Sequence, residues 1–577
     1  MLSSAFRPTP MASDSIWTGP RTLVFVFLLV ALVVLLRLVM VFFWDVPLAI
    51  DEAQYLVWSR ELQAGYFSKP PVIAWALAAS TGLCGAETAS CVRMLQPVAL
   101  GLAGLGVATA AWLLWRNFAA SVWAFALFLS MPLIGFYSQI ATTDAWLLLW
   151  WSWALCAFIW ALSGGGRSRS RLGNPHETQG SNELAWIVLG VICGVGLLTK
   201  YSMAVFAVSV AIVLLREGMV LRAGPWLTLL VSMALMSPNL FWNSEWGFPT
   251  LGHTLNYVDG KGDEALNFGA SANFWLSQFL VMSPLVLLAF LWLSLKSLFT
   301  WGQNAALSRG PGGSPWALDA GARLGLVFAW PMLLVVSFQG LTGKVEANWA
   351  APASVGITLA VVGLWCTASN QIFRSRFFRR SIRGIGLPFT LLLNLAFTAA
   401  VLAMPWGLER FGWAGLAGKD PRLPFVNLEK MAIDVESHLA ALPKESRPTV
   451  VLAHDRHLLA YLDAQLGRTI SVLYWDPLKV MPGDPSKEQL ADASRVAKAP
   501  HHWALQKRFE MPPQTKKELN VAAMHGAMLY VSKALTAEQG AVVLAAIKAQ
   551  PTVKSARLEP LGDVDHGFVL IPIERVR

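Results

Sequence analysis

The stretch LVFVFLLVALVVLLRLVMVFFW, residues 23–44, is an almost unbroken apolar run, and DEAQYLVWSRELQAGYFSKPPVIAW, residues 51–75, follows it closely. A helix needs roughly 20 apolar residues to cross a bilayer, and the first stretch is long enough. It is too long for the core of a signal peptide and lacks a small-residue cleavage site. We therefore expect residues 23–44 to remain as the first membrane span, with the charged segment starting where the chain leaves the membrane.

The composition also indicates a membrane protein. Of 577 residues, 55% are hydrophobic and only 14% are charged, which is too few for the surface of a soluble protein of this length. We expect an α-helical polytopic membrane protein with about eleven spans, near residues 22–44, 94–115, 120–137, 143–163, 185–199, 202–216, 225–242, 274–295, 324–341, 349–367 and 385–404.

Basic residues predict the orientation of these spans. Much of the net charge of +10 lies in short loops between apolar runs, which is typical of the cytoplasmic side and argues against nucleic-acid binding. The densest group is Arg374, Arg376, Arg379, Arg380 and Arg383. With this group and the tail of residues 1–21 in the cytoplasm, an odd number of spans leaves residues 405–577 on the outer face. The predicted location is a bacterial inner membrane with a periplasmic C-terminal domain.

The pattern changes after the membrane domain, residues 22–404. Apolar stretches at 448–453, 469–475 and 526–532 predict strands, and residues 454–467 and 536–550 predict helices. Residues 405–577 should therefore form a small α/β domain. The polar stretch from Asp484 to Ala499 predicts a surface loop. The pairs His454–Asp455 and Asp563–His566 are better interpreted as ordinary loop residues than as catalytic groups.

The first outer loop, residues 45–93, carries both signs of charge. Asp51 and Glu52 open a segment with helical spacing, which predicts an amphipathic helix at the interface that ends at Gly65. Lys69 precedes Pro70-Pro71, which stiffen the backbone. Because ionisable groups at this depth are costly, we favour a functional role. Alternatively, the carboxylates cap the helix and Lys69 reaches the lipid headgroups.

Other polar residues lie near the outer ends of the predicted spans and could line one outer-face cavity. Asp144 begins a span, Lys200 lies at a hairpin tip, and three polar residues alternate at 344–348. Asp144 could instead cap its helix, Lys200 could mark topology, and His253 could be a loop histidine. The full set outside the Asp51–Lys69 loop is Asp144, Lys200, His253, Asn256, Tyr257, Lys344, Glu346 and Asn348.

The five cysteines give one further expectation. Cys156, Cys193 and Cys366 fall inside apolar runs and should be small buried hydrophobic residues. Cys84 and Cys91 share the first outer loop and could form a disulfide if that loop is outside the cytoplasm. No Cys/His spacing indicates a zinc site.

Five segments, in this order, resemble the membrane glycosyltransferases of the GT-C architecture. They are DEAQY (51–55), GYFSKPPVIAW (65–75), TTDAWLLLWW (142–151), GLLTKYSM (196–203) and GKVEANWAAPA (343–353). The similarity is to bacterial relatives of protein O-mannosyltransferases and of the aminoarabinose transferase acting on lipid A, over roughly residues 20–370. It implies a polyprenyl-phosphate sugar donor and transfer at the periplasmic face.

The resemblance also implies residue roles. Asp51 matches the catalytic carboxylate, Lys69 the lysine near the donor phosphate, and Asp144 a second acidic residue. In the aminoarabinose branch the first motif resembles DEGRY and an acid precedes KPP, whereas Gln54 and Ser68 stand at those positions here. Aminoarabinose specificity, and a metal site that uses that acid, therefore do not carry over.

We predict a transferase that moves a sugar, with inversion, to a hydroxyl or phosphate of an envelope lipid, glycan or protein. The predicted catalytic residues are Asp51, Glu52 and Asp144, the donor-phosphate residues are Lys69, Lys200 and Lys344, and the substrate-binding residues are Tyr55, Tyr66, His253, Tyr257, Glu346 and Asn348. The sequence establishes no cofactor, and a divalent metal at Asp51, Asp144 or His253 stays open. The alternatives are a transporter of lipid-linked sugars and a non-catalytic scaffold. Confinement of these charges to one face favours chemistry over passage.

Overall fold

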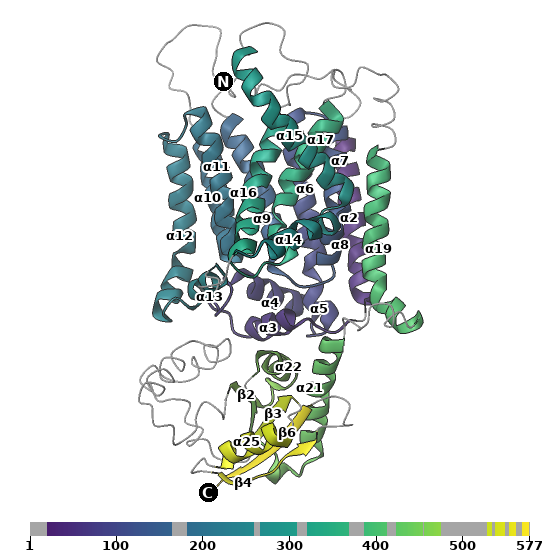
Figure 1. The fold of residues 1–577 in the computed structure, drawn as a ribbon, viewed down its shortest axis with the longest axis vertical. Helices are drawn as coiled ribbons and strands as arrows, with labels where there is room; N and C mark the ends of the chain where they lie inside the picture. The colour runs from purple at the N-terminus through teal and green to yellow at the C-terminus, as the bar shows by residue number, and fades with distance from the viewer. Residues whose placement is uncertain are drawn as a thin grey trace. The chain divides into compact units, whose positions relative to one another are not determined.

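A computed structural model describes most of the chain, and two compact units are found in it (Figure 1). The first unit comprises Met1–Trp44, Arg93–Phe241 and Thr254–Met404, and the second comprises Asp45–Val92, Trp242–His253 and Pro405–Arg577. The second unit thus includes residues 46–92, the predicted first outer loop, as well as the C-terminal region. The described residues are 20–44, 46–163, 182–258, 266–307, 320–367, 386–411, 423–453, 455–474, 528–533, 537–548, 553–560 and 568–575.

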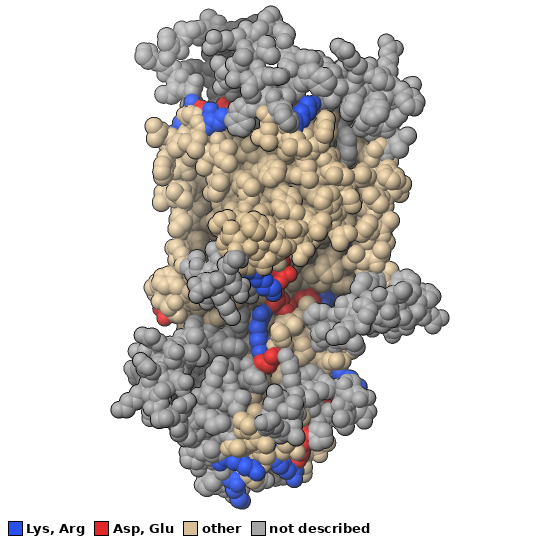
Figure 2. All heavy atoms as spheres, in the orientation of Figure 1, with Lys and Arg blue, Asp and Glu red and all other residues tan. Residues whose placement is uncertain are grey.

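The first unit is helical, as the apolar runs predict. Its longer helices are α2 (Pro20–Phe43), α6 (Leu95–Trp115), α7 (Phe118–Ser130), α9 (Thr143–Ser163), α10 (Glu183–Thr199), α11 (Ala204–Glu217), α12 (Ala223–Glu245), α14 (Phe268–Val281), α15 (Pro284–Leu307), α16 (Ala320–Thr342), α17 (Ala353–Thr367) and α19 (Leu387–Phe411). The short helices α8 (Pro132–Tyr137), η3 (Tyr201–Met203) and η4 (Ala347–Ala350) connect them. On the face drawn in Figure 2, a broad band of this unit shows no charged side chain among its described residues.

Several of these helices have the character of membrane spans. Ala89–Trp115, Thr143–Ser163 and Ala320–Thr342 are long and apolar enough to cross a bilayer by length and composition. Shorter apolar helices, including Phe118–Ser130 and Glu183–Thr199, lie at other predicted positions. The chain is therefore a polytopic membrane protein, while the number of eleven spans stays a prediction.

Two predicted spans are interrupted. Residues 274–295 are not one helix, because α14 and α15 meet at a bend of 118°. Pro284 begins α15, and Ser283 before it has a positive φ of 79°, which ends the preceding helix. Residues 120–137 are likewise divided into α7 and α8 at Met131, directly before Pro132. The structure thus divides each of these predicted spans into two helices, a break that hydrophobicity alone does not indicate.

Small residues allow close helix packing in the first unit. A Cβ atom on Gly325 of α16 would lie 2.6 Å from the carbonyl oxygen of Gly356 in α17, so neither helix tolerates a side chain there. Between α10 and α12, the Ser232 hydroxyl donates a 2.9 Å hydrogen bond to the carbonyl oxygen of Gly190. Close approach and cross-helix hydrogen bonds of this kind stabilise helix pairs in lipid.

The second unit is built around a mixed sheet. Its strands are β1 (Val450–Ala453), β2 (Ser471–Tyr474), β3 (Met528–Lys533), β4 (Val553–Ala556), β5 (Glu559–Pro560) and β6 (Phe568–Arg575). The order is β2-β1-β3-β6-β4, with β5 also pairing with β6. Strand β1 is parallel to β2 and β3, whereas β6 is antiparallel to β3 and β4. The predicted α/β fold, with strands near 448–453, 469–475 and 526–532, is confirmed.

Helices cover both faces of this sheet, and the alternation along β1 explains why. Val450 and Leu452 pack in one apolar cluster with α25 (Ala537–Lys548), while Val451 and Ala453 pack in another with α21 (Leu423–Ala441) and α22 (Arg456–Leu466). Successive side chains of a strand point to opposite faces of the sheet, so a strand that is apolar throughout packs against helices on both faces.

The segment of residues 46–92 contributes to the same core. Helix α3 (Ile50–Ser59) packs beside α22, and its Ala53 and Val57 belong to the cluster of α21 and α22. Residues Glu52 through Ser59 are all buried. The expected amphipathic helix at the interface is thus a helix of a folded core, and it ends at Ser59 rather than at Gly65.

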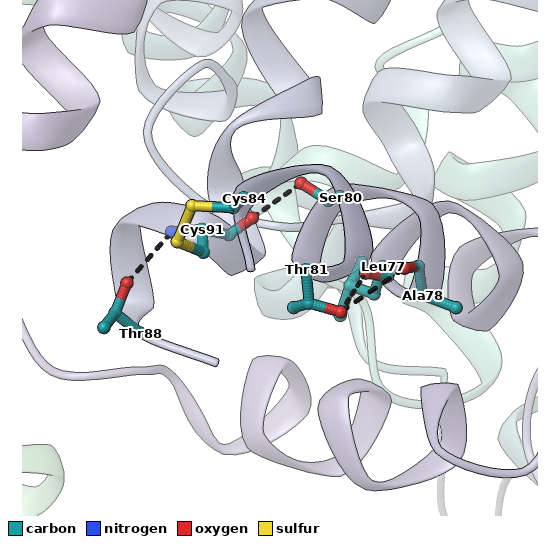
Figure 3. The surroundings of a disulfide bond; sticks show 7 residues. All are labelled: Leu77, Ala78, Ser80, Thr81, Cys84, Thr88 and Cys91. Carbon is teal, nitrogen blue, oxygen red and sulfur yellow. Dashed lines mark hydrogen bonds between the residues drawn. A yellow bond between two sulfur atoms is a disulfide. The ribbon is translucent and has the colours of Figure 1, made fainter. Parts of the chain in front are cut away.

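The disulfide that the sequence left open is present. Cys84 ends α4 (Val72–Cys84) and is bonded to Cys91 in α5 (Ala89–Arg93), as Figure 3 shows. Gly85 has a φ of 75°, a conformation that favours glycine, and it turns the chain after α4. The Ser80 hydroxyl donates a 2.6 Å hydrogen bond to the Cys91 carbonyl oxygen (Figure 3).

Some expectations lie outside the described residues. These are the loop from Asp484 to Ala499, the arginine group at 374–383, His454, and the pair Asp563–His566.

Candidate functional site

Asp51 forms an ion pair that the sequence did not indicate. Its Oδ1 accepts a short hydrogen bond from Nη2 of Arg456, and the Arg456 Nε donates a 2.9 Å hydrogen bond to Oε1 of Gln54. Asp51 and Gln54 are three residues apart in α3 and therefore share one face of that helix. The Asp51 side chain remains 57% exposed, whereas Gln54 is fully buried. The guanidinium is thus held at its Nε by a buried amide, beside an accessible carboxylate.

Arg456 is positioned by the start of α22. Asp455 caps this helix, because its Oδ1 accepts hydrogen bonds from the backbone N–H groups of His457 and Leu458. Because α22 packs against α3, its first residue reaches the Asp51 face. The sequence predicted this helix and the interpretation of Asp455 as a structural residue, but it gave no sign that Arg456 contacts the first loop.

Lys69 and His253 belong to the same electrostatic group. Burial, then the charges of Lys69 and Arg456, lower the pKa of His253 to about 4, while Asp51 opposes the shift. His253 is therefore neutral near pH 7. Its ring centroid lies 5.5 Å from that of Phe67, two residues before Lys69. A turn in which the Tyr66 N–H donates to the Lys69 carbonyl oxygen, at 3.1 Å, fixes the backbone here.

Three other predicted residues of the first loop are part of the packed core. The Glu52 carboxylate is buried and accepts a 2.8 Å hydrogen bond from the Ala49 N–H, which is the capping role named as its alternative. Tyr55 and Tyr66 are buried against Trp58, with ring centroids at 5.6 Å and 4.8 Å. The Tyr66 hydroxyl donates to the carbonyl oxygens of Trp58 and Glu61. These contacts favour structural roles, and the predicted substrate-binding roles stay untested.

A second polar group lies in the first unit, around Asp144 at the start of α9. Its Oδ1 is 2.6 Å from Nζ of Lys200, and its Oδ2 accepts hydrogen bonds from Asn348 at 3.2 Å and from the Tyr137 hydroxyl at 3.3 Å. Asp144 is 2% exposed. The Asp144 N–H donates to the Thr142 hydroxyl, so Thr142 caps the helix and frees the Asp144 carboxylate for these partners.

The remaining predicted residues are exposed or have side chains outside the described residues. Lys344 and Glu346 form a 2.9 Å ion pair whose side chains are 70% and 48% exposed. Tyr257 falls in α13 (Pro249–Val258), and its side chain, like that of Asn256, is outside the description. Asp51, Lys69 and His253 belong to the second unit, and Asp144, Lys200 and Asn348 to the first. The expectation that all of them line one cavity stays a prediction.

The candidate metal ligands do not gather into a metal site. Within the described ranges, no group of three or more His, Cys, Asp or Glu residues could hold an ion. Asp51 and Asp144 are each paired with a cationic side chain instead. The residues present therefore give no support to a metal at these positions.

A cavity of about 710 Å³ lies within the second unit, away from the predicted residues. Glu87 lines this cavity and accepts hydrogen bonds from Arg60 at 2.8 and 3.3 Å and from Arg468 at 2.5 Å. Burial raises the pKa of Glu87, but the two guanidinium groups outweigh it, and the pKa falls below its ordinary value. The lining residues include Val57, Arg60, Glu61, Thr81, Gly85, Glu87, Asp463 and Arg468.

Comparisons with known proteins point to one kind of enzyme. The family described as dolichyl-phosphate-mannose-protein mannosyltransferase matches residues 68–242. The lipid A galacturonosyltransferase RgtD of Rhizobium johnstonii is 28% identical over 334 residues, which are 57% of this chain and 63% of that protein. An undecaprenyl phosphate-alpha-4-amino-4-deoxy-L-arabinose arabinosyl transferase of Pseudomonas aeruginosa is 34% identical over 139 residues, 24% of this chain and 23% of the relative. The chain thus matches less than two thirds of each relative's length.

A solved structure supports the fold. ArnT from Cupriavidus metallidurans, bound to undecaprenyl phosphate, has a TM-score of 0.51 and 15% identity, and the match covers 95% of this chain and 97% of ArnT. At this identity the similarity concerns the fold alone. The match over 95% of this chain therefore shows that the chain has the fold of that structure.

Proposed function

Since this chain is a relative of the GT-C glycosyltransferases, we propose that it transfers a sugar from a polyprenyl-phosphate donor to a lipid of the bacterial cell envelope. The observation that carries the proposal is the group formed by Asp51, Arg456, Lys69 and His253. It combines an accessible carboxylate, a guanidinium, an ammonium group and a neutral imidazole. Such a group can take up a proton and balance phosphate charge, which are the two demands of this reaction.

The chemistry we propose is a single displacement at the anomeric carbon. The oxygen of an acceptor hydroxyl forms a bond to C1 of the sugar while the bond from C1 to the donor phosphate oxygen breaks. The electron pair of the broken bond stays on the phosphate, and the acceptor proton moves to Asp51. Because attack and departure occur on opposite faces, the anomeric configuration inverts.

Two observations support a periplasmic site in the inner membrane. Basic residues between the apolar runs place the Asp51 segment opposite the cytoplasmic side. The disulfide between Cys84 and Cys91 lies in that same segment, and disulfides persist in oxidising compartments such as the periplasm. Polyprenyl-phosphate sugars suit such a site, since no nucleotide-binding motif is evident in the sequence.

The Asp144 group has a supporting role in this proposal. The Asp144 carboxylate forms an ion pair with Lys200 in the first unit, so the charge of Lys200 is already balanced. We therefore assign donor-phosphate binding to Lys69 before Lys200. Lys344, 70% exposed and paired with Glu346, is a weaker candidate again.

The donor sugar is best tested first as a uronic acid. The similarity to the lipid A galacturonosyltransferase extends over 334 residues, whereas that to the aminoarabinose transferase extends over 139. Position 68, which holds an acid in the aminoarabinose branch, is Ser68 here. A site with Lys69 and without that acid is better suited to an anionic sugar than to one that carries an ammonium group.

The test is a reconstituted transfer assay. Purified protein in lipid nanodiscs is incubated with lipid A and either undecaprenyl phosphate-galacturonic acid or undecaprenyl phosphate-aminoarabinose, and the products are identified by mass spectrometry. We expect a uronic-acid adduct on lipid A that the Asp51→Asn protein does not form. Movement of donor across sealed vesicles without any glycosidic product would favour the transporter alternative and contradict the proposal.

A further inference from the structure

The ion pair between Arg456 and Asp51 conflicts with a catalytic role for Asp51 as the site stands. Asp51 Oδ1 already accepts a hydrogen bond from Arg456 Nη2, so this oxygen is not free to receive the proton of an acceptor hydroxyl. Asp51 is nevertheless exposed, and Arg456 is its charged partner. If Asp51 is to receive a proton, its hydrogen bond with the guanidinium must be released when substrate binds.

We propose that Arg456, together with Lys69, binds the phosphate group of the lipid-linked donor, and that this phosphate replaces Asp51 on the guanidinium. The inference rests on the proposed function and adds a residue of the C-terminal region to the site. It also gives the Arg456–Asp51 pair a purpose: it keeps the carboxylate occupied until donor is present.

The geometry favours exchange at one end of Arg456 only. Its Nε is fixed by Gln54, which is fully buried, so the side chain stays in place. Its Nη2 is paired with Asp51, and the Arg456 side chain as a whole is 30% exposed. A guanidinium held in this way presents a planar fork, and such a fork suits two phosphate oxygens.

The charges also balance through the reaction. A donor phosphodiester carries one negative charge, so Lys69, Arg456, Asp51 and the phosphate sum to zero when the donor is bound. Transfer releases a phosphate monoester with a second negative charge, while Asp51 gains the acceptor proton. The sum is again zero. His253 does not disturb this balance, because the pKa of about 4 keeps it neutral.

Binding of the lipid phosphate tests this inference without any transfer. The probe is undecaprenyl phosphate, with undecaprenol as the uncharged comparison, added to the full protein in nanodiscs. We expect Arg456→Gln to weaken undecaprenyl phosphate binding by about 10- to 100-fold, the loss of one charge-assisted contact, and to leave undecaprenol binding unchanged. Arg456→Lys should retain part of the affinity.

Arg468→Gln is the matched control. Arg468 lies at the other end of the α22 segment, pairs with Glu87, and is 68% exposed. This variant should bind both lipids as the unmodified protein does. Added guanidinium should restore phosphate binding to Arg456→Ala and not to Lys69→Ala, which a merely structural role for Arg456 would not produce.

The outcomes separate the two proposals. Undecaprenyl phosphate binding by Arg456→Gln that equals that of the unmodified protein overturns the inference, even if sugar transfer is observed. Arg456-dependent phosphate binding without transfer to any lipid supports the inference and counts against the proposed function.

Discussion

Lys200 Nζ lies 2.6 Å from Asp144 Oδ1, and the side chains are only 18% and 3% exposed. The two residues are 56 positions apart and come from the end of α10 and the start of α9. A buried pair of this kind is costly to break, because the charge that remains has no partner.

Asp144→Asn should therefore destabilise the protein by about 3 kcal/mol, whereas the double variant Asp144→Asn/Lys200→Met should recover much of that loss. The measurement is thermal unfolding in detergent for the two single variants and the double variant. Equal stability of single and double variants would mean that the pair contributes little. Restored stability without restored transfer would assign a direct role in transfer to Asp144 or Lys200.

Asp51→Asn should lower the rate of sugar transfer by about 100- to 10,000-fold, the usual range for loss of a general base. Its effect on stability should stay below about 1 kcal/mol, since the pair with Arg456 is partly exposed. Glu436→Gln is the control, because Glu436 is an exposed carboxylate of the same unit that accepts a 2.6 Å hydrogen bond from Gln465. Normal turnover by Asp51→Asn would remove Asp51 from catalysis.

His253 should make stability depend on pH. Its folded pKa of about 4 lies below the ordinary 6.5, so the unfolded chain takes up a proton that the folded protein does not. The stability is complete above pH 6.5 and falls as the pH drops from 6.5 toward 4. In His253→Gln, the proton that only the unfolded chain takes up is no longer bound, so the free energy of unfolding should depend less on pH between 6.5 and 4. The measurement is the melting temperature as a function of pH. Identical pH profiles would refute the assigned burial and charge environment of His253.

Loss of the disulfide should loosen the second unit. Cys84 and Cys91 are seven positions apart, and closing so short a loop corresponds to about 2 kcal/mol in the chain-entropy account. The loop carries Glu87, which joins Arg60 and Arg468. Reduction, or the Cys84→Ser/Cys91→Ser variant, should lower the melting temperature and leave Lys200 and Asp144 unaffected. A melting temperature insensitive to reductant would contradict this linkage.

Much of the fold was accessible from the sequence because apolar length is a direct signal. The spans expected at 94–115, 143–163 and 324–341 correspond to α6, α9 and α16 within a few residues. The bend at Ser283 was not accessible, since the residues on both sides are equally apolar. Helix α3 was placed correctly, but its burial depends on α21 and α22, which lie some 370 residues later.

The candidate site was only partly predictable for a similar reason. The segments with Asp51, Lys69 and Asp144 stand out because charges at a membrane boundary are unusual. Arg456 does not stand out, since an arginine at the start of a helix in a mixed polar segment is ordinary. Its meaning comes from contact with Asp51, 405 positions away, which no local pattern encodes.

The second unit is assembled from parts of the chain that are synthesised far apart. Helix α3 emerges early, and its Ala53 and Val57 are covered by side chains of α21 and α22. At ribosomal speeds of 5–20 residues per second, those partners follow roughly 20 to 80 s later. During that interval the apolar face of α3 lacks the side chains of α21 and α22 that cover it in the folded protein, so this part of the core can close only after residues 423–466 have been made. A chain halted before α21 would never complete this unit, however well its membrane helices had inserted.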